Sequence, residues 1–282
     1  MRKSSIALLV ALMVAAVVLS AAGCGKKESA NSAKGILENS QKALLNARST
    51  KVNGSIVVKT PGAEEKQSKD TFTGEFNNIG GGDVEGHVVG QDQDGQQSEG
   101  YLKDGYAYTY KPTTGWQKQK MEGVTGSTAA MINPESVSAM IKYAENLQKL
   151  PDQSKNHVIS FDVGKKFYQE VLSGLEEASS APTTAEQSMA QQYGDLIKSM
   201  VGDIQVSVVM KIDKANYYPS EVTVKASAKD IPMMGDVSME SSMTFSDYDV
   251  PVTVTLPPEA ASAKEMESGL SGGIPGLPGL GL

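Results

Sequence analysis

The sequence predicts an α+β domain, in which one large antiparallel sheet carries amphipathic helices on one face. Segments near the C-terminus alternate apolar and polar residues with a period of two. Short apolar runs bounded by turn residues fill much of the first half, and stretches with helical apolar spacing open the domain and interrupt its middle. Because such strands have one apolar face each, we expect the helices to cover that face.

The first residues have the pattern of a secretory signal peptide. Arg2 and Lys3 precede an apolar run over residues 6–18, and small residues follow at 20–23. An uncleaved membrane anchor is the alternative, but the run is shorter than the ~20 apolar residues that span a bilayer. We therefore expect residues 1–23 to be removed.

Cys24 is the only cysteine of the 282 residues, so it has no partner for an internal disulfide. The stretch Leu-Ser-Ala-Ala-Gly-Cys at 19–24 resembles the lipobox of bacterial lipoproteins, with Ala21 where leucine is more common. The resemblance implies that Cys24 carries a diacylglycerol and becomes the first mature residue. The protein would then be anchored by lipid on the outer, extracytoplasmic face of the cell membrane, because two acyl chains suffice for stable anchoring.

The charge of the chain argues against nucleic acid as a partner. Loss of residues 1–23 removes two basic and no acidic side chains, so the net charge changes from −7 to −9. An acidic chain is repelled by phosphate backbones and by anionic lipid surfaces. Attachment to the membrane is therefore assigned to the acyl chains.

Composition divides the mature chain into three parts. Residues 24–34 are predicted to be the acylated cysteine and a flexible tether, and residues 263–282 a disordered tail of mostly Gly, Pro and Leu. Residues 35–262 have the length of one domain, which we expect to be a monomer.

The domain is predicted to open with a helix and continue as a meander. Ile36, Leu37, Ser40, Leu44 and Ala47 lie on one helical stripe. Asp104-Gly105 between two tyrosine-bearing runs is typical of a tight hairpin. Six antiparallel strands are expected, at residues 51–60, 70–78, 83–91, 99–105, 106–111 and 115–121.

The middle of the domain is predicted to contain three helices and one strand. Asn133-Pro134 has the residues of a helix start, and an apolar face follows at Val137, Met140, Ile141, Ala144 and Leu147. The strand is expected at 156–163, and further helices are expected at 167–175 and 189–200.

The last part is predicted to be β-structure. Residues 204–212, 221–228 and 237–245 alternate strictly, as expected for antiparallel strands buried on one side. A final strand is expected at 252–256, before Pro257-Pro258.

Residues 100–121, 217–226 and 241–260 resemble segments of LolA-like extracytoplasmic lipoproteins, among them the LppX/LprG-like proteins and an uncharacterised group of Gram-positive lipoproteins. The resemblance extends over most of 35–262 and includes no catalytic signature. It implies a curved, unclosed barrel of antiparallel strands with helices on its concave side. It also implies a cavity between sheet and helices that holds a lipid or an acylated molecule.

Methionines on the predicted dry faces are consistent with such a cavity. Eleven remain after Met1 and Met13 leave with the signal. Flexible thioethers adapt to an acyl chain, but they also fill ordinary gaps in a core. The residues expected to line the cavity are Met140, Met189, Met200, Val206, Val208, Met210, Val224, Met239 and Met243.

The sequence contains no enzyme motif in the structural context that the motif requires, and no cofactor is expected. Residues 269–273 have nucleophile-elbow spacing but lie in the predicted tail, without the strand and helix that the motif requires. The chain contains no Ser-x-x-Lys and no phosphate-binding Gly-Lys-Ser/Thr loop.

No metal site is expected either. His87 and His157 are assigned to different strands, and Asp92-Gln93-Asp94-Gly95 lacks the glutamate that ends a calcium loop, so a polar turn is predicted there. Aromatic residues gather on one hairpin, where they either pair across strands or stack on sugars or peptides: Tyr101, Tyr106, Tyr108, Tyr110 and Trp116.

The sequence is consistent with two functions. The first is a non-enzymatic lipoprotein that binds or carries a lipid or an acylated molecule. The second is an envelope lipoprotein with a filled core, which binds a protein or cell-wall partner through the aromatic hairpin.

Overall fold

The computed structural model describes residues 29–60, 66–77, 84–112, 114–120, 141–167, 204–231 and 235–265. Helices α2 (Ala33–Asn46) and α7 (Pro258–Ala261) lie wholly within these ranges, and residues 141–142 and 165–167 are also helical. The strands are β1 (Ser49–Thr60), β2 (Lys66–Asn77), β3 (Glu85–Gln91), β4 (Gln97–Lys103), β5 (Tyr106–Lys111), β6 (Gly115–Lys120), β7 (Ala144–Gln153), β8 (Asn156–Val163), β9 (Gln205–Asp213), β10 (Pro219–Ile231), β11 (Gly235–Ser246) and β12 (Lys264–Glu265).

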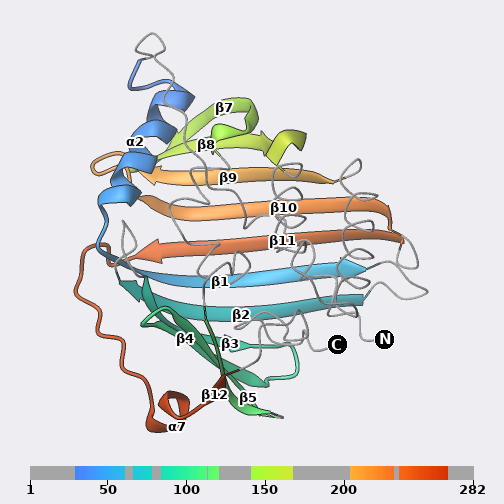
Figure 1. The fold of residues 1–282 in the computed structure, drawn as a ribbon. Coiled ribbons are helices and arrows are strands. Elements are labelled where there is room, and N and C mark those ends of the chain that lie inside the picture. The colour runs from blue at the N-terminus through green and yellow to red at the C-terminus, as the bar shows by residue number, and fades with distance from the viewer. Residues whose placement is uncertain are drawn as a thin grey trace.

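All these strands form one open sheet in the order β12-β6-β5-β4-β3-β2-β1-β11-β10-β9-β8-β7. Neighbours from β6 to β7 pair antiparallel, and β12 adds a short parallel pair to β6. Figure 1 shows the long central strands stacked between β7 and β2, with β3–β5 inclined to them so that the sheet curves. The predicted α+β class with an unclosed antiparallel sheet is confirmed.

The N-terminal cap of helix α2 and the spacing of its apolar residues explain where the helix begins and which side it buries. The Ser32 hydroxyl accepts a hydrogen bond from the Gly35 N–H at 3.0 Å, which satisfies a free donor of the first turn. Its buried side includes Ile36, Leu37, Ser40 and Leu44, and the helix packs on β7 and β8. This agrees with the predicted opening helix.

The six-strand meander is also confirmed. Each of β1 to β5 pairs with the next strand along the chain, so β1 to β6 form the meander. Asp104 and Gly105 join β4 to β5 with φ of 53° and 75°, so both turn residues have left-handed backbone conformations. Such two-residue turns match the twist of the flanking strands, which explains the Asp-Gly signal.

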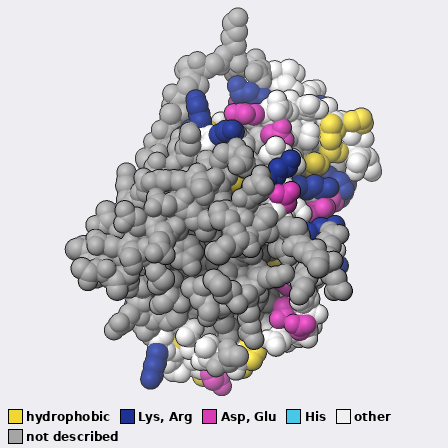
Figure 2. Space-filling view, turned by 90° about the vertical axis from the view of Figure 1, so that its right-hand side faces the viewer, with side chains coloured by type: hydrophobic (Ala, Val, Ile, Leu, Met, Phe, Trp, Pro, Cys, Tyr) yellow, Lys and Arg dark blue, Asp and Glu magenta, His cyan; other side chains and the backbone are white. Residues whose placement is uncertain are grey.

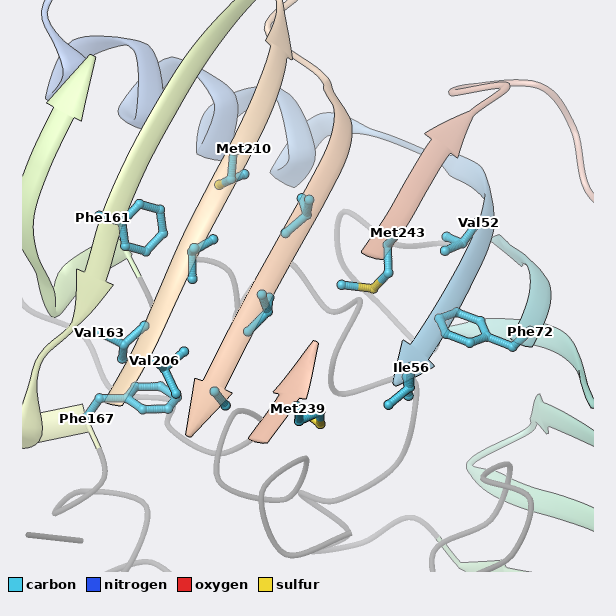
Figure 3. Close-up of a cluster of buried hydrophobic side chains, with 14 of the residues drawn as sticks. Val52, Ile56, Phe72, Phe161, Val163, Phe167, Val206, Met210, Met239 and Met243 are labelled. Atoms are coloured by element: carbon cyan, nitrogen blue, oxygen red, sulfur yellow. The ribbon is translucent and has the colours of Figure 1, made fainter. Parts of the chain in front are cut away.

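One face of the sheet carries what we call the main cluster. Cross-strand neighbours place Phe161 beside Val208, Val208 beside Val224, and Met239 beside Val58. The side chains from β8, β9, β11, β1 and β2 labelled in Figure 3 lie on this face together with Phe167. The cluster continues to Leu102 and Ala107 on β4 and β5, so it spans most of the sheet.

Glycines make room for the aromatic rings of the main cluster. Gly54 pairs with Phe72 across β1 and β2, and Gly86 pairs with Phe76 across β2 and β3. A methyl group at either glycine would overlap the ring of its partner. Glycine in these strands therefore reflects a close approach of side chain to backbone.

A second cluster lies on the opposite face, over β4 to β6. Its buried members are Tyr101, Tyr108, Val252, Val254 and Ala260, with Tyr106, Trp116 and Leu256 packed against them. Tyr101 and Leu102 are consecutive residues of β4, and their side chains point to opposite faces of the sheet. Both are buried, so this part of the sheet is covered on both sides. The expected single dry face therefore holds for the central strands but not here.

The segment after β11 covers the second cluster. It leaves β11, runs past the strand ends to α7 and then pairs as β12 with β6 (Figure 1). The strand predicted at 252–256 is wrong, because this extended segment has no strand pairing. Val252 and Val254 face the second cluster, which explains the alternation, and the Lys103 ammonium donates to the Val254 carbonyl at 2.8 Å.

The helix predicted to extend to Leu147 is also wrong at its C-terminal end. Ala144 and Leu147 belong to β7, which forms a hairpin with β8. Register shifts interrupt β7 twice, and Asn146 has φ of 52°. These irregularities break the alternation of period two, so the sequence pattern resembled a helix. The strand expected at 156–163 is confirmed as β8, and the three alternating strands are confirmed as β9 to β11.

Candidate ligand-binding site

The residues predicted to line a cavity fall into two groups. Six lie in the main cluster and are between 1 and 6% exposed: Val206, Val208, Met210, Val224, Met239 and Met243. Met140, Met189 and Met200 lie outside the described residues, as do Cys24 and the predicted signal at 1–23. The helix expected at 189–200 lies there too, as does that at 167–175 beyond Phe167.

A hollow of about 670 Å³ opens near one end of the sheet. It lies where β1 and β8 end and where β9 and β11 begin, with residues of β7 and β10 completing its described wall. Val206 and Met239 are the two predicted residues in that wall. The size is in the range of small-molecule sites, about 300–1,000 Å³.

The wall of the hollow has an apolar part. Val163, Ile204, Val206, Ala226 and Met239 contribute to it, and each is buried within the main cluster. These residues come from β8, β9, β10 and β11, apart from Ile204, which directly precedes β9. Because successive side chains of a strand point to opposite faces of the sheet, these apolar side chains face the main cluster and point away from the polar rows described next.

The wall also has a polar part, built from two rows across the exposed face of the sheet. The first row runs through cross-strand neighbours from β8 to β11, Asp162, Ser207, Lys225 and Glu240, and ends at the apolar Val57 of β1. The second row consists of Gln205 of β9, Ser227 of β10, Ser238 of β11 and Lys59 of β1. These residues were not predicted, because polar positions of alternating strands ordinarily face water.

One carboxyl group, that of Asp70 on β2, lies on the main-cluster face of the sheet. Asp70 pairs with Ile56 of β1, so this group points to the apolar side. Burial is the largest cause that raises the pKa of Asp70 to about 6, and the Asp92 carboxylate adds to it. A hydrogen bond from the Gln93 backbone N–H acts in the opposite direction.

The polar atoms of the second cluster bind one another. One Glu99 carboxylate oxygen is 2.8 Å from His87 Nε2 and accepts the Tyr101 hydroxyl at 2.7 Å. The His87 and Tyr101 rings stack at 4.4 Å, and burial followed by the bond to Glu99 raises the pKa of Tyr101 to about 12. Trp116 contacts Tyr101 and Tyr110 with ring centroids 5.8 and 5.4 Å apart. Cross-strand pairing therefore accounts for this aromatic cluster.

Nothing in the described residues resembles a metal centre. His87 lies in β3 and His157 in β8, as predicted, and His157 Nδ1 contacts Asp152 at 3.2 Å. Within the ranges that the structure describes, no group of three His, Cys, Asp or Glu residues is placed to hold a metal ion. Asp92 instead accepts backbone N–H groups of Asp94 and Gln96, which makes the predicted polar turn.

The described part of the chain also contains no helix that is long and apolar enough to cross a membrane.

A model of the family of unknown function DUF6612 matches residues 32–265. The chain belongs to this family. The match covers all the described helices and strands. No curated protein matches the sequence.

Several solved structures are similar to the chain. A LolA superfamily protein, NE2245 from Nitrosomonas europaea, is 12% identical over 79% of this chain and 95% of that one, with a TM-score of 0.30. A proposed outer membrane lipoprotein-sorting protein domain from Vibrio parahaemolyticus is 13% identical over 78% of this chain and 95% of that one, with a TM-score of 0.30. The MucA/MucB complex of Pseudomonas aeruginosa gives 10% identity over 76% and 57%, with a TM-score of 0.31. Because these TM-scores are low, the fold of this chain is defined by its own strand order.

Proposed function

We propose that the DUF6612 chain is a non-enzymatic lipoprotein that binds a lipid or an acylated molecule outside the cytosol. The observation that carries this proposal is the main cluster, an apolar face that continues from β8 to β5 across the open sheet. An apolar face of this extent suits an acyl chain, which prefers such a surface over water.

The proposed location rests on the start of the sequence. Cys24 follows a basic start, an apolar run and four small residues, and it is the only thiol of the chain. Acylation there would hold the domain at the outer face of the membrane. Growth with radiolabelled palmitate should label the full chain, and Cys24→Ser should lose both the label and the membrane association. Equal labelling of Cys24→Ser would refute the anchor.

Binding is tested on the full chain, purified in a maltoside detergent and analysed by native mass spectrometry. We expect about one acyl lipid bound to each chain. Val206→Asp places a charge in the main cluster and should abolish the bound lipid, whereas Ser207→Asp changes the adjacent exposed residue, whose side chain lies on the opposite face of the sheet, and should retain the lipid.

Circular dichroism of both variants distinguishes loss of binding from loss of folding. A folded Ser207→Asp protein that keeps its lipid, beside a folded Val206→Asp protein without it, supports the proposal. A wild-type chain that carries no lipid and takes up no added acyl ligand would refute the proposed lipid binding.

A further inference from the structure

Two buried hydroxyl groups on neighbouring strands of the sheet have no hydrogen-bond partner. Within the part of the chain that the structure describes, five buried side chains carry such an unpaired polar atom, and of these only Ser98 of β4 and Thr109 of β5 lie on adjacent strands. Ser98 is 7% exposed and Thr109 is 5% exposed. A buried hydroxyl without a partner costs free energy, so this pair requires an explanation.

These hydroxyls differ from the polar groups of the surface. On the face shown in Figure 2, described basic and acidic side chains lie next to one another, where water reaches them. Ser98 and Thr109 instead face the main cluster. Ser98 lies four residues before Leu102 on β4, Thr109 lies two residues after Ala107 on β5, and both Leu102 and Ala107 belong to that cluster.

Gly100 leaves a space beside the two hydroxyls. It lies two residues after Ser98 and pairs with Val88 of β3 and Thr109 of β5. If a methyl group were built at Gly100, the Tyr108 carbonyl oxygen at 3.4 Å would be the only atom of the described residues within 4 Å of it. We call the space in front of Gly100, between these side chains, the notch.

The notch offers hydrogen-bond donors but no charge. The described side chains around it, Val88, Ser98, Leu102 and Thr109, are uncharged and at most 7% exposed. A carboxylate brought there would lose its water without gaining a counter-charge from them. A carbonyl oxygen has two lone pairs, and it can accept from both hydroxyls, since diagonal neighbours of a strand pair lie roughly 7 Å apart.

We infer that the notch holds the carbonyl group of a fatty acyl ester. The hydroxyls of Ser98 and Thr109 donate to the carbonyl oxygen, and the acyl chain lies along the main cluster, which includes Val88 and Leu102 and continues over β2 and β1. The notch and the cluster lie on the same face of the sheet, so one ligand meets both. This inference rests on the proposed lipid binding and specifies the chemical group next to the acyl chain.

The test compares 1-palmitoylglycerol with 1-O-hexadecylglycerol on the full chain, by competition in native mass spectrometry. The two lipids have the same head and the same chain length, but the ether lacks the ester carbonyl. We expect the ester to bind about tenfold better, the effect of one or two buried hydrogen bonds. Palmitate, a carboxylate at neutral pH, should also bind more weakly than the ester.

Variants connect the preference to the notch. Ser98→Ala combined with Thr109→Val removes both hydroxyls and should reduce the ester preference to less than about twofold. Gly100→Ala should reduce it by filling the notch, and its methyl group meets the backbone at an ordinary contact distance, so the sheet should still form. Thr73→Val and Ser238→Ala remove exposed hydroxyls from the opposite face and should leave the preference unchanged.

Urea unfolding, followed by circular dichroism, shows whether the two hydroxyls serve a ligand or the fold. Because they have no partner, the lipid-free double variant should unfold at the same or a higher urea concentration than the lipid-free wild type. The ester should raise the midpoint of the wild type more than that of the variant. A lower midpoint of the lipid-free double variant would overturn the inference, because the hydroxyls would then stabilise the fold itself.

The binding outcomes separate this inference from the proposed function. Equal binding of ester and ether by the wild type would overturn the role of the notch and leave lipid binding intact. So would an ester preference that survives the double variant, or palmitate binding as tight as that of the ester. Absence of binding by every lipid would instead overturn the proposed function.

Discussion

The two apolar clusters of the sheet are built in different ways. The main cluster consists largely of aliphatic residues, phenylalanine and methionine that alternate along consecutive strands, and it spans β8 to β5 on one face. The second cluster is aromatic, lies on the opposite face of β4 to β6, and is closed by residues 250–260 from the end of the domain. One is completed by pairing of strands, whereas the other needs a segment distant in sequence.

This difference indicates that the two clusters differ in how readily they unfold. The strands that carry the main cluster from β8 to β5 are each paired on both sides within the sheet. The covering segment at 250–256 has no ladder hydrogen bonds, so it depends on Val252, Val254 and the bond from Lys103. We therefore expect the second cluster to open more readily than the main one.

The largest effect is expected from Phe76→Ala. The ring is 1% exposed and lies against Gly86, so truncation leaves a cavity that should cost about 3–5 kcal/mol of unfolding free energy. Far-UV circular dichroism during urea unfolding measures the sheet, and fluorescence of Trp116, the only tryptophan, reports on the second cluster. Both transitions should move to lower urea together, since the second cluster needs the sheet. A fluorescence transition that stays in place would show that the clusters are independent.

An intermediate effect is expected from Val254→Ala. The side chain is 3% exposed in the second cluster, and its loss should cost about 2 kcal/mol locally. The Trp116 fluorescence transition should then precede the circular dichroism transition. Thr253→Ala alters the neighbouring exposed position and serves as the control. If Val254→Ala shifted both transitions equally, the covering segment would be part of the main cooperative unit.

The smallest effect is expected from Asp70→Asn at the edge of the main cluster. The folded protein holds the Asp70 proton more tightly than the unfolded chain, because the pKa is raised from 3.8 to about 6. The unfolding free energy should therefore decrease as pH rises through that interval. Asp70→Asn should remove this decrease and stabilise the protein at pH 7 by on the order of 1 kcal/mol, discounted for solvent screening. Identical pH profiles of the two proteins, from thermal melts between pH 4 and 7, would contradict this origin.

Much of the fold was predictable because local chemistry specifies it. Strict alternation identified β9 to β11, and Asp104-Gly105 identified the hairpin, since its left-handed turn needs such residues. Strand β7 was missed because its bulges interrupt the alternation on which the prediction depends. Residues 252–256 alternate as a strand does, but burial of Val252 and Val254 in the second cluster produces the same pattern without pairing.

The candidate site was less predictable. Val206 and Met239 were among the expected lining residues, and both lie in the wall of the hollow. The polar residues of the wall were missed because alternating polar positions of a strand ordinarily face water. Their cross-strand order from β8 to β1 depends on the register of the sheet.

The sequence by itself determined which residues are apolar at which spacing, and hence the helix, most of the strands and one dry face. It also predicts, from the single thiol at Cys24 and the residues before it, how the chain is attached to a membrane. Tertiary structure decided which face the last segment covers, where the sheet is buried twice, and which side chains meet around the hollow. The reason is physical: periodicity reports on burial of a strand or helix, whereas contacts between distant segments depend on register and curvature, which no local pattern encodes.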